Sequence, residues 1–81
     1  MPVSKGLKFF KKILKEAVLN NGEKLEKISI QDNSSYVTVS LIGKNKTASF
    51  NVNKVDVLEI INNTKENYSL NFLVKNIEWR V

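Results

Sequence analysis

Carboxylates are the side chains of this chain that could do acid–base or metal chemistry. Asp56 and Glu59 stand three residues apart, a spacing that puts two side chains on one face of a helix. A working pair would need a third ligand or a base close by. The other acids considered, Asp32, Glu66 and Glu78, stand apart from this pair, and no Gly-rich phosphate loop accompanies them. We therefore interpret the carboxylates as helix-capping and solvated residues.

The absence of two residue types argues further against catalysis. The chain contains no histidine, the usual general base and the commonest metal ligand. It also contains no cysteine, so it can form no disulfide, thiolate nucleophile or Cys-based zinc site. We therefore expect a protein that is not an enzyme and that uses no metal ion and no cofactor. Its 81 residues suffice for one domain, 1–81, with one compact core.

Lysines near the start of the chain form the other group with a chemical character. Residues 1–15 contain five lysines and no acid, whereas eight basic residues face eight acidic ones from residue 16 onward. The net charge of +5 therefore resides in this segment. At about 100° per residue, the lysines occupy one half of a helix over 4–21, and apolar residues occupy the other half. We name the basic half the lysine face: Lys5, Lys8, Lys11, Lys12 and Lys15.

The lysine face has two main interpretations. The simplest is a solvated surface opposite an apolar half that packs on the rest of the protein. The functional interpretation is an electrostatic site for a polyanionic partner, either nucleic acid or an acidic protein surface. Lysine is a point charge without the bidentate geometry of arginine, so the face suits phosphates better than bases. Binding to nucleic acid would therefore depend weakly on base sequence.

Binding to a membrane surface is a third interpretation, because aromatic and lysine residues lie on opposite sides of the same helix. We disfavour it, since Phe9, Phe10 and their aliphatic neighbours Ile13 and Leu14 are needed to cover a sheet. No apolar stretch approaches the roughly 18 residues that span a bilayer. We therefore expect a cytoplasmic protein, in the host cytoplasm if a phage encodes it.

The helix that carries the lysine face has a clear end, at which Gly22 can adopt the left-handed conformation that stops a helix. Alternating apolar and polar residues then predict strands, most clearly over 36–42 and 47–52. A turn centred on Lys44 and Asn45 pairs residue 42 with residue 47. This register places the apolar residues of both strands on one face, with Leu41 opposite Ala48, Val39 opposite Phe50 and Val37 opposite Val52.

A preceding strand is predicted from the turn-forming residues between Asp32 and Ser35. A four-residue loop there would pair residue 31 with residue 36. It would set Ile30 beside Val37 and Ile28 beside Val39, on the same apolar face. The three strands then form an antiparallel meander.

Protein binding is the second class of function. The hydroxyl and amide residues on the other side of the meander lack the charges that deter a partner or a second copy from docking. We name them the polar sheet face: Thr38, Ser40, Thr47, Ser49 and Asn51. Trp79 and Arg80 are further candidates, because both residue types are enriched at binding hot spots. Solvation of the polar sheet face and closure of the core by Trp79 are the simpler interpretations.

Asn53 is predicted to open a second, short helix, with Asp56 three residues on in an approximate capping box. Its apolar stripe would consist of Val55, Leu58 and Ile61, with Val57 nearby. The many β-branched residues of this segment leave a strand as the alternative.

Tyr68 to Val74 alternate in a way that predicts a last strand, and the alternation continues with its parity reversed from Ile77 to Val81. A straight strand over 68–81 would be about 46 Å long at ~3.3 Å per residue, too long for this domain. We therefore expect a bend at Lys75 and Asn76.

These elements predict an α+β fold in two layers. It consists of an N-terminal amphipathic helix, a three-stranded antiparallel meander, a second short helix and a C-terminal strand. The favoured function is a non-enzymatic binding module whose lysine face meets nucleic acid. The alternative is a small accessory protein of phage or plasmid type, acting by protein–protein binding as an inhibitor or assembly factor, with a homo-oligomer as one form.

Overall fold

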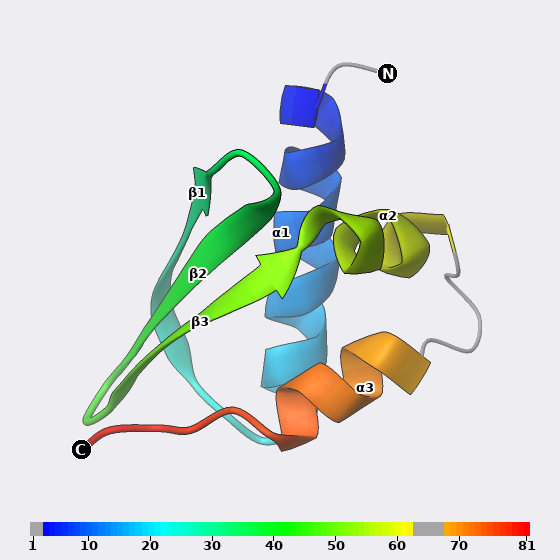
Figure 1. The fold of residues 1–81 in the computed structure, drawn as a ribbon. Coiled ribbons are helices and arrows are strands. Elements are labelled where there is room, and N and C mark those ends of the chain that lie inside the picture. Colours follow the sequence, from blue (N-terminus) through cyan, green and yellow to red (C-terminus); the bar gives the residue numbers. More distant parts are fainter. Residues whose placement is uncertain (1–2, 63–67) are drawn as a thin grey trace.

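The computed structural model describes residues 3–62 and 68–81, apart from the side chains of residues 3–5, 68 and 69. Figure 1 shows the order of the elements along the chain. They are α1 (Val3–Asn20), β1 (Leu25–Asp32), β2 (Tyr36–Gly43), β3 (Thr47–Asn53), α2 (Lys54–Asn62) and α3 (Tyr68–Lys75).

The predicted α+β architecture is confirmed. In the described part of the chain, three helices pack on one face of a three-stranded antiparallel sheet of order β1-β2-β3. α1 lies alongside β1 and also contacts α2 and α3. In Figure 1, α2 and α3 are drawn on the opposite side of α1 from β1. The helices and the sheet thus form two layers around one hydrophobic core.

α1 ends as its sequence predicts. Gly22 adopts the left-handed conformation, with φ of 90°. Its N–H donates to the carbonyl of Leu19, and the N–H of Glu23 donates to the carbonyl of Val18, at 3.1 and 3.3 Å. This pair of bonds is the Schellman arrangement, which satisfies carbonyls at the end of a helix. The chain therefore leaves α1 in a defined direction and enters β1 after two further residues.

The core forms where the apolar half of α1 meets the sheet. Phe10, Leu14 and Val18 have no exposed surface, and neither do Val37 and Val39 of β2. Residues on successive turns of the helix thus share one cluster with alternate residues of the central strand. This packing buries the side of α1 opposite the lysine face.

The register predicted between β2 and β3 is confirmed. Ile42 pairs with Thr47 across the turn, and the three apolar pairs fall as expected: Leu41 with Ala48, Val39 with Phe50, and Val37 with Val52. Alternation on two adjacent strands separated by a short turn leaves few registers that keep both apolar sets on one face.

The register predicted between β1 and β2 is wrong by two residues. Ile30 pairs with Val39 and Ile28 with Leu41, because the turn is tighter than a four-residue loop. The N–H of Asn33 donates to the carbonyl of Tyr36 at 3.0 Å, which leaves only two residues at the tip. A shift of two residues keeps every side chain on its face, so alternation alone does not detect it. Val39 therefore lies between Ile30 and Phe50 rather than between Ile28 and Phe50.

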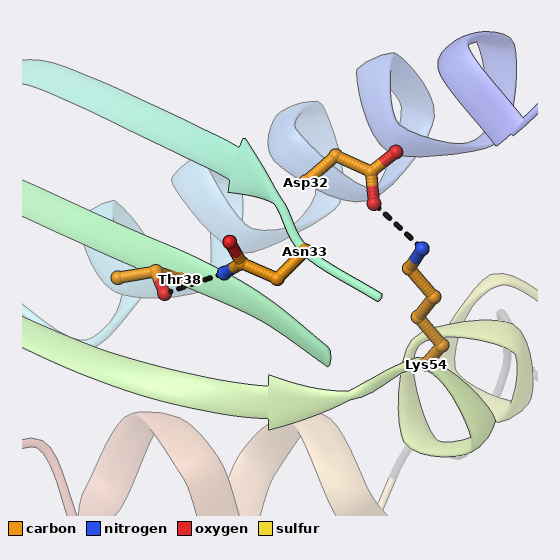
Figure 2. Close-up of polar contacts among 4 residues, drawn as sticks. All are labelled: Asp32, Asn33, Thr38 and Lys54. Atoms are coloured by element: carbon orange, nitrogen blue, oxygen red, sulfur yellow. Dashed lines mark hydrogen bonds and ion pairs between the residues drawn. The ribbon is translucent and has the colours of Figure 1, made fainter. Parts of the chain in front are cut away.

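Polar contacts join the tip of this hairpin to the start of α2, as Figure 2 shows in part. Nζ of Lys54 lies 2.7 Å from Oδ1 of Asp32, and the N–H of Lys54 donates to the carbonyl of Ser35 at 3.0 Å. Both groups of the ion pair are partly exposed, so the pair adds little stability by itself. Together with the backbone bond, it holds α2 against the end of the sheet.

α2 is a helix, as predicted, but its buried stripe is not the predicted one. Val57 and Ile60 are buried and Ile61 is half-buried, whereas Val55 is 75% and Leu58 is 60% exposed. The segment contains two overlapping apolar stripes that both have helical spacing. The direction in which the chain leaves β3, and the packing of α2 on α1, select the stripe that faces the core.

The predicted C-terminal strand over 68–74 is wrong, because this segment forms the helix α3. Leu70 and Val74 are buried, Leu73 is half-buried, and Phe72 is 70% exposed. Leu70, Leu73 and Val74 have the i, i+3, i+4 spacing of a helix, which coexists here with period-two alternation. α3 packs against α1 and α2, and this packing favours a helix over a strand for the segment.

The last residues are extended but form only one bridge of a strand. α3 ends at the predicted bend, where Nδ2 of Asn76 donates to the carbonyl of Phe72 at 2.7 Å. Beyond it, Arg80 pairs antiparallel with Thr47 of β3. The N–H of Thr47 donates to the carbonyl of Arg80 at 2.8 Å, and the N–H of Arg80 donates back at 2.7 Å. The reversal of parity after Val74 therefore marks a helix end rather than a strand bend.

Adjacent phenylalanines on α1 test whether the core lies where the structure places it. Phe10 has no exposed surface, whereas Phe9 is 41% exposed. Phe10→Ala should lower the free energy of unfolding by about 3–5 kcal/mol, because it leaves a cavity in the core. Phe9→Ala is the matched control and should cost about 1 kcal/mol or less. Urea denaturation measures both, and equal losses would contradict the packing of α1.

Candidate functional site

The lysine face is displayed as the sequence predicts. Lys8, Lys11, Lys12 and Lys15 are all exposed on α1. Lys5 lies in the same helix, with its side chain outside the described part of the structure. The buried residues Phe10 and Leu14 hold the opposite side of the helix on the sheet. The lysines are therefore carried by an anchored helix and point away from the core.

The charge of this surface is not neutralised by ion pairs. Among the described residues, the ion pairs are Lys46 with Glu23 and Lys54 with Asp32, and neither involves a lysine of α1. Four positive charges on two turns of helix thus face solvent without a compensating acid in contact. Such a surface attracts anions over roughly a Debye length, about 8–10 Å at ordinary ionic strength.

The polar sheet face lies on the other side of the sheet from the helices. Ser29, Ser40 and Ser49 are paired in one row across the strands. In a neighbouring row, Nδ2 of Asn33 donates to Oγ1 of Thr38 at 3.0 Å, as Figure 2 shows. The hydroxyl of Thr38 in turn donates to Oδ1 of Asn51 at 2.9 Å. Hydrogen bonds within the sheet thus occupy part of this face.

One end of the polar sheet face is hollowed. A depression of about 450 Å³ lies among Ser40, Ser49 and Arg80, with the half-exposed Ile42 beside them. The structure therefore brings together four of the residues predicted for protein binding, Ser40, Thr47, Ser49 and Arg80. Thr38 lies farther along the strand and does not line the depression.

Trp79, which was also predicted for protein binding, has partners inside the protein. Its ring packs against the core, and Nζ of Lys46 lies 4.7 Å from the ring centroid. Lys46 also forms an ion pair with Glu23 in the loop after α1. Lys46 thus ties the β2–β3 turn to the loop and to the C-terminal tail, and Trp79 mainly closes the core.

Two residues that shape the surface were not predicted from the sequence. Lys46 was not singled out, because a lysine in a turn has no pattern that indicates a contact with a distant ring. Phe72 belongs to the segment predicted as a strand, yet it is exposed on the helix α3. The helical spacing of Leu70, Leu73 and Val74 was the signal that could have placed Phe72 outside.

The described residues add no metal centre to these surfaces. Within the described residues, no group of three or more acidic side chains lies close enough to hold a metal ion. Asp56 and Glu59 are both exposed on α2. None of the described helices combines the length and the apolar character that crossing a membrane requires.

Removal of the Trp79 ring should free the tail from the sheet. We expect Trp79→Ala to lower the free energy of unfolding by about 1–3 kcal/mol, through lost packing and the lost cation–π contact. Amide hydrogen exchange should become faster at Thr47, whose N–H is bonded to Arg80. The amide of Gly43, bonded to Lys46 at 2.8 Å, is the internal control and should keep its protection. Unchanged exchange at Thr47 would show that Trp79 does not hold the tail.

Comparison of the chain with protein-family models, with curated proteins and with solved structures found no match. Its function must therefore be inferred from its residues and their geometry. The strongest charged feature among them is the lysine face of α1.

Proposed function

We propose that this protein is a non-enzymatic module that binds a polyanion, most simply nucleic acid, through the lysine face. The observation that supports the proposal is the display of Lys8, Lys11, Lys12 and Lys15 on one exposed side of an anchored helix, without ion pairs among the described residues. A solvated face needs no such concentration of one sign of charge. A cytoplasmic location, where nucleic acid is accessible, is part of the proposal.

The spacing of the lysines suits a nucleic-acid backbone. Lys8 and Lys15 are seven residues apart, or about 10 Å along a helix axis, with the other two lysines between them. Duplex DNA carries one charge per about 1.7 Å of its axis, so it presents about six phosphate charges over that length. The long lysine side chains can reach phosphates without a fixed geometry.

Low sequence specificity follows from the residue type. Lysine ammonium groups do not match the paired acceptors of a guanine edge as an arginine fork does. The chain contains a single arginine, Arg80, which pairs with β3 through its backbone rather than lying on α1. Contacts would therefore be made mainly with phosphates and would tolerate most base sequences.

Protein binding is the second candidate function, and one observation favours it. Ser40, Ser49 and Arg80 surround the depression at the end of the polar sheet face. A protein seated there would make the chain an inhibitor or an assembly factor. Because such a contact involves few charges, its affinity should depend much less on salt than that of the lysine face.

A salt titration with duplex DNA tests the proposed function. If four lysines each neutralise a phosphate, the logarithm of the binding constant should fall with the logarithm of salt concentration with a slope of about −3 to −4. Changing Lys8, Lys11, Lys12 and Lys15 to Gln keeps helix propensity and leaves the core untouched. This variant should unfold like the parent and lose binding to DNA of any sequence.

A second variant separates the lysine face from net charge. It carries four Lys→Gln changes at exposed lysines elsewhere, so that both variants retain a net charge of five minus four, or +1. We expect it to keep most of the affinity for DNA. Equal loss in both variants, or no binding by the parent at low salt, would contradict the proposal. The control positions are Lys24, Lys27, Lys44 and Lys75.

A further inference from the structure

We propose that the free edge of β3 binds an extended peptide segment of a partner protein as a fourth, antiparallel strand, and that this segment is apolar in the middle and basic at both ends. The site is distinct from the lysine face and takes a different class of partner. Its elements are the outward backbone groups of β3, a groove beside them, and two carboxylates.

Backbone N–H and C=O groups on the outer side of β3 are available to pair with another strand. Thr47 is already paired on its outer side, through two hydrogen bonds to Arg80. Because the backbone groups of a strand point alternately to its two sides, the N–H and C=O of Ser49 and Asn51 point outward like those of Thr47. Of these three residues, only Thr47 has a partner on this side within the described structure. Arg80 thus shows the antiparallel geometry in which this edge pairs. Trp79, the preceding residue, lies opposite Ala48, and beyond it the outward groups of Ser49 and Asn51 stay unpaired among the described residues.

The two edges of the sheet differ in their protection. β1 carries Glu26, Lys27 and Asp32 as exposed charges, which discourage another strand from pairing with it. β3, with the sequence TASFNVN, carries no charge at all. In the described part of the chain, the edge of β3 has no charged residue of its own and no strand that continues the bridge to Arg80.

A groove follows this edge between β3 and α3. It consists of two adjoining hollows, of about 520 and about 260 Å³, which share Asn51, Phe72 and Leu73 in their linings. We name the two together the β3-edge groove. Phe72 forms part of its wall although it is 70% exposed, so the groove presents an aromatic ring that the core does not use. A strand added to β3 would cover this ring.

The charges of the groove define the partner. Asp56 lines the larger hollow and Glu78 lines the smaller one, and among the described residues no lysine or arginine lines either. The groove is therefore acidic on a protein whose net charge is +5. An occupant with basic residues near both ends and an apolar residue between them would match the two carboxylates and the ring of Phe72. Nucleic acid would be repelled from the same place.

A second copy of the chain fits the groove less well. Lys46 and Lys54 flank β3 but are already paired with Glu23 and Asp32, so edge-to-edge pairing of two β3 strands would bring no uncommitted basic residue to Asp56 or Glu78. The partner is therefore a basic, apolar peptide segment rather than the same strand of another copy. Side chains directly opposite each other in an antiparallel pair share a face. The middle apolar residue would thus lie opposite Phe50, on the side of α3, and the segment would turn away from the edge before Ala48, which faces Trp79.

The probe for this site is the capped pentapeptide Lys-Thr-Leu-Thr-Lys, and the measurement is amide hydrogen exchange by NMR. At a peptide concentration of about ten times Kd, exchange at Ser49 and Asn51 should slow about tenfold, because only the free fraction exchanges. The amide of Thr47, already bonded to Arg80, is the internal control and should not change. The peptides Glu-Thr-Leu-Thr-Glu and Lys-Thr-Thr-Thr-Lys should give less protection.

Variants of exposed residues test the side-chain contacts without disturbing the fold. Phe72→Ala should weaken the affinity for the pentapeptide about fivefold, through the loss of one apolar contact between the peptide and the ring on α3. Glu78→Gln should weaken it about two- to fivefold at low salt, as expected for a partly exposed ion pair. Glu59→Gln is the matched control, because this exposed acid does not line the groove, and it should leave the affinity unchanged. The variant with four Gln residues on α1 should bind the peptide like the parent.

Three outcomes would overturn the proposal. One is an absence of added protection at Ser49 and Asn51 at millimolar peptide. Another is equal affinity for the parent and Phe72→Ala. The third is protection of these amides that appears without peptide and rises with protein concentration, which would identify a second copy as the occupant.

Discussion

The arrangement of the surfaces of this protein depends on one interaction, the burial of the apolar side of α1 against the apolar face of the sheet. The sheet has an apolar face built around Val37, Val39 and Leu41, and the described strands bring no second sheet to cover it. Phe10, Leu14 and Val18 supply that cover and lose all contact with water. Since burial of apolar side chains is the main favourable term in folding, the orientation of α1 is determined by these contacts. The outward direction of the lysines follows from it.

A two-layer domain with so few strands also leaves surfaces that a larger sheet would bury. None of the described elements covers the polar sheet face, and among them β3 remains an edge apart from its bridge to Arg80. The lysine face lies on α1, the polar sheet face on the side of the sheet away from the helices, and the β3-edge groove between β3 and α3. The basic helix and the acidic groove suit partners of opposite charge, so the two proposed sites need not compete.

The parts of the fold that were predictable are those in which local signals agree with one another. The amphipathic pattern of 4–21, the glycine at position 22 and the β2–β3 register each have a strong local cause. The lysine face belongs with them, since a helix with one apolar half must expose the other. The β1–β2 register differed by two residues because side-chain alternation has a period of two, and the hydrogen bonds of Asn33 selected the tighter turn.

Sequence by itself therefore determined the fold class, the helix that anchors the core and the charge that this helix displays. Tertiary structure decided the secondary structure of 68–75 and the buried side of α2, because each segment contains two apolar patterns of similar strength. Only packing against α1 and the sheet distinguishes Leu70 and Leu73 from Phe72, or Ile60 from Leu58. The β3-edge groove follows from the same decision: α3 as a helix leaves the edge of β3 open, whereas a strand there could have closed it.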